Sequence, residues 1–340
     1  QRHHVRMTGP DGAITLSCRS VFVSGTIYPN EDFDAGSVAE KLRDALSGIG
    51  TDEEAVLQIL GNHTTDQRLE IAQAFKTAYG KDLIDDLKSE LSGDFEDLCI
   101  ALLTPPRVYD ARQIHEAISG AGTDETTLVE IMVTRSNDEI NQIKEEYQKE
   151  FENDLESDLQ GDTSGYFGRL MVSLCCAGRE SDEWQWADED KAAEDAQKFY
   201  EAGEAKWGTE EAELNAILCL TSPGQLRKTI EKFEELTGGT MEESIRSECS
   251  GALQEGYLAI VESVKSKPRY FARRLHECMS GLGTSDTDLI RIIVSRSEID
   301  LEEIKEEFET MYERPLTEAI ESECGGDYKR LLLAIINPPA

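Results

Sequence analysis

Four acidic residues each follow a short glycine-rich segment at the same distance in sequence. Each of these glycine-rich segments interrupts a helical pattern and is called a cut. The pattern Gly-x-Gly-Thr occurs in ALSGIGTDEE, AISGAGTDET and CMSGLGTSDT, and a looser form occurs in EAGEAKWGTEE. The glycine before each threonine and the acid 40 residues after it form these pairs: Gly50 and Glu90, Gly122 and Asp162, Gly208 and Glu248, and Gly283 and Glu323. The glycines themselves are 72, 86 and 75 residues apart. Because the offset of 40 stays constant while these intervals vary, loop and acid are predicted to form one structural unit that is built four times.

A glycine-rich cut and a distant acid can together supply oxygen atoms to a cation. A single glycine after a helix is more often a left-handed cap than a binding site. The last carbonyl groups of a helix, however, lack partners within the helix and carry the negative end of its dipole. Several carbonyls and one carboxylate make a flexible all-oxygen ligand set, which suits Ca²⁺ with its roughly six to eight ligands. Zinc prefers His and Cys, Mg²⁺ needs a tighter octahedron, and no EF-hand loop occurs, so the sequence predicts a calcium site of another kind.

The elements that must position these groups are predicted to be helices. Apolar residues recur at helical spacing in segments such as NQIKEEYQKEFENDLESDL, and no alternating strand pattern of any length competes. Each unit contains a helix, the cut, a second helix, two amphipathic segments and a closing apolar helix after an SG or GG turn. Repeats of this length indicate an all-α protein of four multi-helix units. The polar segment GRESDEWQWADEDKAAEDAQ is interpreted as a connector between the second and third units.

The charge excludes some kinds of partner. With 34 Lys and Arg against 69 Asp and Glu, the formal charge is −35. Nucleic acid is a poor partner, because phosphate binding needs a basic surface. An anionic membrane should repel the chain unless a cation lies between the two. The alternative is that the acidity only maintains solubility.

Cysteine usage and hydropathy favour a cytoplasmic protein. The eight cysteines lie mostly in apolar runs, no CxxC pair occurs, and buried reduced thiols are expected. No apolar run approaches the ~20 residues that span a bilayer, and the N-terminal segment does not make a convincing secretory signal. Residues 1–6, which include His3 and His4, are interpreted as a tag remnant. Release from the cell by a route without a signal peptide, or a place at the cell surface, stays open as an alternative.

Taken together, the four cuts, the acid 40 residues after each cut and the long middle connector resemble the annexin core over roughly residues 25–338. The resemblance implies four homologous five-helix repeats arranged as a curved disc, whose convex face binds Ca²⁺ and acidic phospholipid. It implies a head at 1–30, repeats at 31–105 and 106–178, a connector at 179–190, and repeats at 191–265 and 266–340.

The resemblance also implies a ligand set for each repeat, made of backbone carbonyls and one acidic side chain. In repeats 1 and 2 these are Leu46, Gly48 and Gly50 with Glu90, and Ile118, Gly120 and Gly122 with Asp162. In repeats 3 and 4 they are Gly203, Lys206 and Gly208 with Glu248, and Met279, Gly281 and Gly283 with Glu323.

Further residues resemble auxiliary annexin positions. Thr51 with Glu53, and Thr123 with Glu125, are similar to additional calcium positions, and the alternative is that they are helix N-caps and first-turn acids. Trp207 is similar to a tryptophan that inserts at the membrane interface, with the Lys206 side chain in reach of a lipid headgroup. The alternative for Trp207 is an ordinary packed residue.

Glu130 and Arg291 interrupt apolar runs at the same place, 8 residues after Gly122 and Gly283. An unpaired buried ion costs several kcal/mol, so both need partners. In annexins the matching positions pair across a central polar channel, together with the counterparts of four further residues: Asp110, Arg135, Arg296 and Asp300. We favour a salt-bridge network that fixes the repeats over an ion path.

These observations predict a binding protein and not an enzyme. His63, His115 and His276 are scattered, and none is paired at the spacing of a catalytic triad. The first hypothesis is peripheral, calcium-dependent binding to anionic membranes such as phosphatidylserine surfaces. The second is a helical-repeat adaptor that binds a cytoskeletal protein or an enzyme through its head or its concave face. Membrane aggregation, self-association on membranes and calcium conduction are further alternatives.

Overall fold

A computed structural model of the chain describes residues 24–48, 50–181, 187–204, 211–281 and 283–338. Over these residues the chain forms twenty α-helices and no β-strand. The helices fall into four successive groups of five, so the prediction of an all-α fold with four five-helix repeats is confirmed. No helix in these ranges is both long enough and apolar enough to span a lipid bilayer.

The helices of each repeat follow one another in the same order. Repeat 1 contains α1 (Ala35–Ala45), α2 (Glu53–Gly61), α3 (Thr65–Tyr79), α4 (Leu83–Glu90) and α5 (Gly93–Leu103). Repeat 2 contains α6 (Pro106–Ser119), α7 (Glu125–Thr134), α8 (Asn137–Phe151), α9 (Leu155–Asp162) and α10 (Gly165–Cys175). Repeat 3 contains α11 (Glu189–Glu204), α12 (Glu211–Leu220), α13 (Pro223–Thr237), α14 (Met241–Glu248) and α15 (Gly251–Lys265). Repeat 4 contains α16 (Lys267–Cys278), α17 (Asp286–Arg296), α18 (Leu301–Tyr312), α19 (Leu316–Glu323) and α20 (Gly326–Ile336).

Local signals at the helix ends repeat with the fold. The third helix of every repeat ends at a residue in the left-handed conformation: Gly80 (φ 66°), Glu152 (φ 59°), Gly238 (φ 72°) and Glu313 (φ 53°). This conformation turns the chain and lets the cap amide bond back to the last turn. Two repeats use glycine at this position and two use glutamate, which adopts it at an energetic cost.

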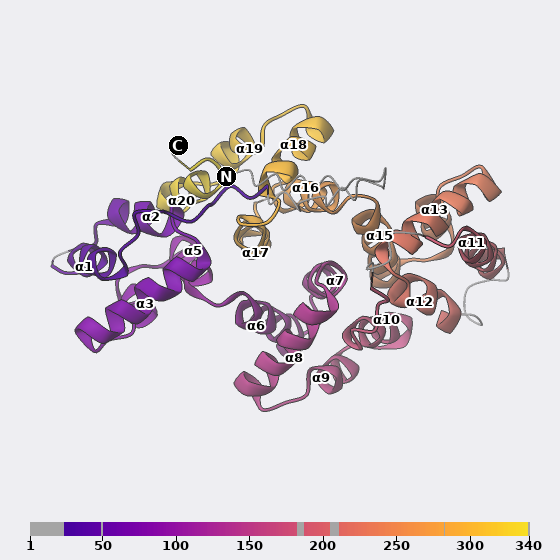
Figure 1. The fold of residues 1–340 in the computed structure, drawn as a ribbon, viewed down its shortest axis with the longest axis horizontal. Coiled ribbons are helices and arrows are strands. Elements are labelled where there is room, and N and C mark those ends of the chain that lie inside the picture. Colours follow the sequence, from indigo (N-terminus) through magenta and orange to yellow (C-terminus); the bar gives the residue numbers. More distant parts are fainter. Residues whose placement is uncertain (1–23, 49, 182–186, 205–210, 282, 339–340) are drawn as a thin grey trace, which may run out of the picture.

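Seen down the shortest axis of the molecule, the four repeats surround its centre (Figure 1). Repeats 1 and 4 pack through α2, α5, α17 and α20, and repeats 2 and 3 pack through α7, α10, α12 and α15. The second helices α7 and α17 lie next to the centre (Figure 1). Residues far apart in sequence therefore meet there.

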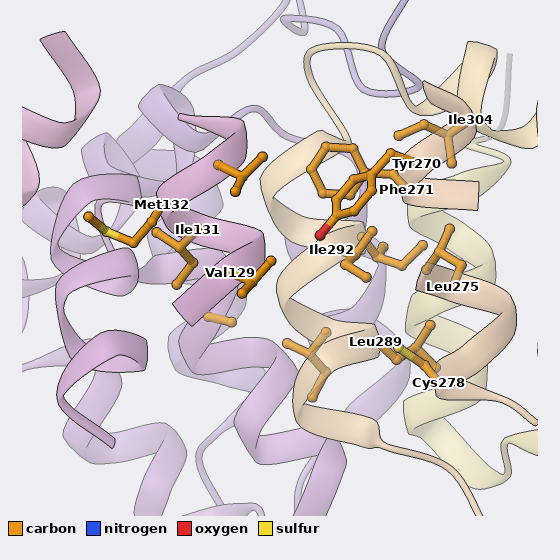
Figure 2. Packing of buried hydrophobic residues seen from close by; sticks show 14 of the residues in the cluster. Val129, Ile131, Met132, Tyr270, Phe271, Leu275, Cys278, Leu289, Ile292 and Ile304 are labelled. Atoms are coloured by element: carbon orange, nitrogen blue, oxygen red, sulfur yellow. The ribbon is translucent and has the colours of Figure 1, made fainter. Parts of the chain in front are cut away.

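The core consists of the apolar stripes of these helices. Buried side chains of α7 in repeat 2, and of α16, α17 and α18 in repeat 4, are seen together in Figure 2. Five of the described cysteines are buried, as expected, but Cys324 is half-buried and Cys176 is exposed. All seven described thiols are free.

The segment that precedes α1 is bound to repeat 4. The Ser24 amide donates to the Ile299 carbonyl at 3.0 Å, and the Thr26 hydroxyl donates to the Ile335 carbonyl at 2.6 Å. Gly25 lies so close to repeat 4 that a Cβ atom there would be 2.6 Å from the backbone of Glu298. The part of the head that the structure describes is thus a strap across the C-terminal repeat.

Candidate metal sites

The glycine-rich cuts of repeats 1, 2 and 4 form the same closed loop. In each, an amide donates to the carbonyl seven residues earlier: Asp52 to Ala45 at 2.9 Å, Asp124 to Ala117 at 2.8 Å, and Ser285 to Cys278 at 2.8 Å. The accepting carbonyl lies at the C-terminal end of the first helix, and the donating amide lies just before the second helix. The bond therefore holds the two helix ends together, and the residues between them form a closed loop.

The second glycine of each loop has a positive φ, a backbone conformation that favours glycine. Gly50, Gly122 and Gly283 have φ of 89°, 103° and 95°, and a Cβ atom at any of them would meet nothing within 4 Å. The first glycine differs between repeats: Gly48 and Gly281 have φ of 123° and 130°. Its counterpart Gly120 is extended at φ −95°, because α6 continues through Ser119.

The loops of repeats 1, 2 and 4 contain carbonyl oxygens that accept no hydrogen bond from a described residue. Between described residues, no hydrogen bond ends on the carbonyls expected as ligands in these three loops: Leu46, Gly48, Gly50, Ile118, Gly120, Gly122, Met279, Gly281 and Gly283. All six of the glycines are exposed to solvent. Exposed, unpaired carbonyls at a helix C-terminus are donors that a hard cation can use.

The four acids occupy one structural position. Glu90, Asp162, Glu248 and Glu323 are each the last residue of the fourth helix of a repeat. In repeat 2 the acid directly contacts the loop, since the Thr123 hydroxyl donates to Asp162 Oδ2 at 2.6 Å. In repeat 2 the offset in the sequence therefore corresponds to a contact in space.

The acids of repeats 1 and 4 face a shared cavity of about 560 Å³. Glu53 and Glu90 line it from repeat 1, and Thr284, Asp286 and Glu323 line it from repeat 4. Asp286 was missed by the sequence reasoning, although it follows Gly283 by three residues, as Glu53 follows Gly50. The Thr284 hydroxyl donates to Asp286 at 2.7 Å, so the auxiliary pair of threonine and acid occurs in repeat 4 as well.

The auxiliary threonines are not the helix N-caps. Asp52 and Asp124 cap α2 and α7, each accepting from a backbone amide in the first turn at 3.1 Å. Thr51 and Thr123 precede these caps, and Glu53 and Glu125 are the first helical residues. The neighbouring aspartates, and not the threonines, are therefore the N-caps of these helices. The threonine hydroxyls are available for other contacts.

Side chains alone do not form a metal site in the part of the chain that the structure describes. No group of three or more His, Cys, Asp or Glu residues is placed there to hold an ion. The groups that the loops and the fourth helices offer are instead backbone carbonyls and a single carboxylate, all of them oxygen. This set fits Ca²⁺ and does not fit zinc.

The loop of repeat 3 lies largely outside the described residues. This applies to Lys206, Trp207 and Gly208. Gly203 lies in the last turn of α11, and Glu248 is the exposed final residue of α14.

Buried charges at the molecular centre form ion pairs. Arg291 of α17 contacts Glu130 of α7 at 2.8 and 3.1 Å, and neither side chain has any exposed surface. Arg291 also contacts Asp288 at 2.6 Å. Burial alone would lower the pKa of Arg291, but the two carboxylates raise it well above its usual value. This pair joins repeat 2 to repeat 4.

The other predicted central charges pair within their own repeats. Arg135 makes a two-pronged contact with Asp110 at 2.7 and 3.0 Å, and Arg296 makes one with Asp300 at 2.7 and 2.8 Å. Arg274 was missed by the sequence reasoning, and it lies 3.7 Å from Glu130. Arg274 lies in an amphipathic helix and does not interrupt an apolar run, so the sequence around it does not indicate that its side chain is buried.

Comparison with known proteins agrees with this architecture. The annexin family model matches four stretches, residues 37–102, 109–174, 194–260 and 270–335. Human annexin A7 is 48% identical over 312 residues, which cover 92% of this chain and 64% of that protein. Mouse annexin A4 is 43% identical over 311 residues, which cover 92% of this chain and 97% of that protein. The chain thus spans less than two thirds of the length of annexin A7.

Solved structures give the same result. A structure of annexin III superimposes with a TM-score of 0.90 at 40% identity, covering 94% of this chain and all of that one. A calcium-bound annexin (Sm)1 superimposes with a TM-score of 0.83 at 31% identity, covering 92% and 93% of the two chains. With four matched repeats, the five-helix order within each and the acid at the end of every fourth helix, this chain belongs to the annexin family.

Proposed function

We propose that this annexin binds acidic phospholipid membranes in a calcium-dependent manner through the loops of its four repeats. Calcium and phospholipid binding are characteristic of the family, and one of the similar structures is calcium-bound. The observation that supports the proposal is the set of loop carbonyls in repeats 1, 2 and 4 that accept no hydrogen bond from a described residue, together with an acid at the end of every fourth helix.

The proposed ligands follow from these positions. In repeat 1 they are the carbonyls of Leu46, Gly48 and Gly50 and the carboxylate of Glu90. Repeats 2 and 4 supply the equivalent groups with Asp162 and Glu323, and repeat 3 would do so with Glu248. Three carbonyls and one carboxylate are fewer donors than the roughly six to eight that Ca²⁺ accepts. The remaining positions would be open to phosphate oxygens of a lipid headgroup.

Local bridging is needed because the total charge stays negative. Four Ca²⁺ ions carry +8, which would leave the chain at −27 from its formal −35. A body of that charge is still repelled by an anionic surface. Adhesion must therefore come from the loops themselves, and four weak sites on one rigid body act together through their effective concentration.

Residues beside the ligands would contribute further contacts. Thr51 with Glu53, and Thr123 with Glu125, are proposed as auxiliary calcium positions. In repeat 3, Trp207 is proposed to lie at the membrane interface, where an amphipathic ring is favoured. The Lys206 side chain would reach a headgroup phosphate.

The proposal is tested by sedimenting the chain with phosphatidylserine vesicles over a series of calcium concentrations. Wild-type protein is expected to pellet with calcium and to stay in the supernatant with a chelator. Glu90→Gln is expected to require several-fold more calcium, because the acid of one site is lost. Pelleting that ignores the chelator contradicts the proposal and favours the adaptor hypothesis.

A charge-matched control separates ligand loss from bulk electrostatics. Glu145 is exposed on α8, away from the loops. Glu145→Gln removes the same charge as Glu90→Gln and should leave the calcium requirement unchanged or slightly lower it. Equal shifts in the two variants would show that Glu90 is not a ligand.

A further inference from the structure

A cavity of about 290 Å³ lies between repeats 3 and 4, and its ionisable lining is mostly basic. The charged side chains that line it are four cations and two acids: Arg246, Lys265, Arg269, Arg273, Glu242 and Glu262. Thr240, Tyr270 and Met311 complete the wall. Four cations around one small cavity are unexpected in a chain with a formal charge of −35.

Both acids of the cavity are paired with cations. Lys265 Nζ lies 2.8 Å from Glu242, and it also contacts Glu234, outside the lining, at 2.8 Å. Arg273 contacts Glu262 at 2.6 Å and Glu277, also outside the lining, at 2.6 Å. These pairs have hydrogen-bonding geometry, so cations already engage the carboxylates of the cavity.

The other two arginines have only loose ion pairs. The nearest carboxylate to Arg246 is Glu262 at 4.0 Å, and the nearest to Arg269 is Glu307 at 3.6 Å. Neither guanidinium donates a hydrogen bond to a described residue, and both side chains are more than half exposed (54% and 60%). A guanidinium whose N–H groups make no hydrogen bond presents a planar fork of donors that matches a phosphate group.

Backbone dipoles add to the side-chain charge. Thr240 is the N-cap of α14, and Arg269 and Tyr270 lie in the first turn of α16. Residues of two helix N-termini therefore line one cavity. Such ends favour bound anions.

The cavity spans from the N-terminal end of α16 to the last turn of α14. At about 1.5 Å per residue, Arg269 and Met279 are separated by about 15 Å along the helix, so the α16 side of the cavity is remote from the loop of repeat 4. On the other side, Arg246 lies two residues before Glu248.

We propose that the cavity between repeats 3 and 4 binds a compact phosphate-bearing molecule, with Arg246 and Arg269 as its primary contacts. Binding at this site is proposed to need no calcium. A soluble phosphate compound and a lipid headgroup share this chemistry, and the experiment below distinguishes them.

The proposal is tested by isothermal titration of the full chain with inorganic pyrophosphate in the presence of a chelator. Saturable binding at one site is expected. Arg246→Gln and Arg269→Gln should each weaken binding at least tenfold, and Glu242→Gln should strengthen it, because it removes an acid from the cavity. Arg112→Gln is the matched control, since Arg112 lies in repeat 2 and is fully paired with Glu150.

Two further measurements separate the alternatives. Vesicles of phosphatidylcholine with phosphatidylinositol bisphosphate, again in chelator, should not pellet the protein if the ligand is soluble; pelleting that needs both arginines would assign the same chemistry to a lipid headgroup. Absence of pyrophosphate binding, or binding that persists in the double arginine variant, overturns the proposal. Calcium-dependent pelleting of Arg269→Gln with phosphatidylserine vesicles should equal that of wild type, because Arg269 lies at the end of α16 that is remote from the loop of repeat 4, so this test is independent of the proposed membrane function.

Discussion

The guanidinium of Arg291 and the carboxylate of Glu130 are fully buried and join α17 to α7. Removing one partner of a buried pair leaves the other charge without compensation. We expect Glu130→Gln to lower the free energy of unfolding by about 3 kcal/mol, measured by urea denaturation. The double variant Glu130→Leu/Arg291→Leu should lose less than the sum of the single variants, because it leaves neither charge unpaired. Additive losses would contradict a direct pair.

His63 provides a second test at the same scale. Its ring is buried, Nδ1 contacts the Ile59 carbonyl at 2.7 Å, and Nε2 has no partner among the described residues. Burial lowers its pKa below the usual value, and the positive charge of Arg68 lowers it further. The folded state therefore binds the proton less readily than the unfolded state.

The sign of the pH dependence follows from this difference. A base whose pKa is depressed on folding contributes fully above its unfolded pKa of about 6.5, and this contribution is lost as the pH falls below that value. Wild type should therefore lose thermal stability between about pH 6.5 and pH 5 in excess of the variant His63→Gln. Parallel pH profiles for the two proteins would show that His63 does not report on folding.

At the scale of elements, the GxGT loop depends on one backbone conformation. Gly122 has φ 103° and Gly120 has φ −95°, although they stand two residues apart in the same loop. Gly122→Ala should raise the calcium needed for vesicle pelleting, because alanine disfavours positive φ by about 1–2 kcal/mol. Gly120→Ala keeps its carbonyl in an allowed conformation and should leave the requirement unchanged. Equal effects of the two substitutions would contradict this account of the loop.

The caps of the third helices give a prediction about stability. Glu152 and Glu313 adopt the left-handed conformation where the other repeats have glycine. Glu152→Gly should raise the free energy of unfolding by about 0.5–1 kcal/mol, because glycine removes the strain. Glu152→Gln keeps the strain and removes only the charge, so it should change stability less than Glu152→Gly in denaturant titrations. A greater gain from Glu152→Gln would assign the effect to charge.

The elements were largely predictable from sequence because their signals are local. Helical periodicity and the repeated cut gave the all-α class, and the constant offset placed Glu90 and its counterparts at one structural position. Contacts between repeats were harder to predict from the sequence. Arg274 of α16 joins the central pair only through packing of separate helices, which no spacing in the sequence reports. Asp288, by contrast, lies three residues before Arg291 on the same helix. The different course of the loop in repeat 2 depends on where α6 ends, and pattern alone does not fix helix ends.

At the scale of the whole molecule, four sites on one body should act together. Replacing the acids one after another with amides (Glu90→Gln, Asp162→Asn, Glu248→Gln and Glu323→Gln) should raise the calcium requirement for pelleting by multiplying factors. Each replacement also makes the chain less negative, so simple electrostatics predicts the opposite trend. A calcium requirement that falls across the series would rule out local bridging.

The most direct measurement is anomalous diffraction from crystals of the chain grown with calcium. Peaks are expected at the loops of repeats 1, 2 and 4, with carbonyl oxygens and the respective acid Glu90, Asp162 or Glu323 at about 2.3–2.6 Å from the ion. Ions found only on exposed carboxylates elsewhere, with none at these loops, would contradict the account.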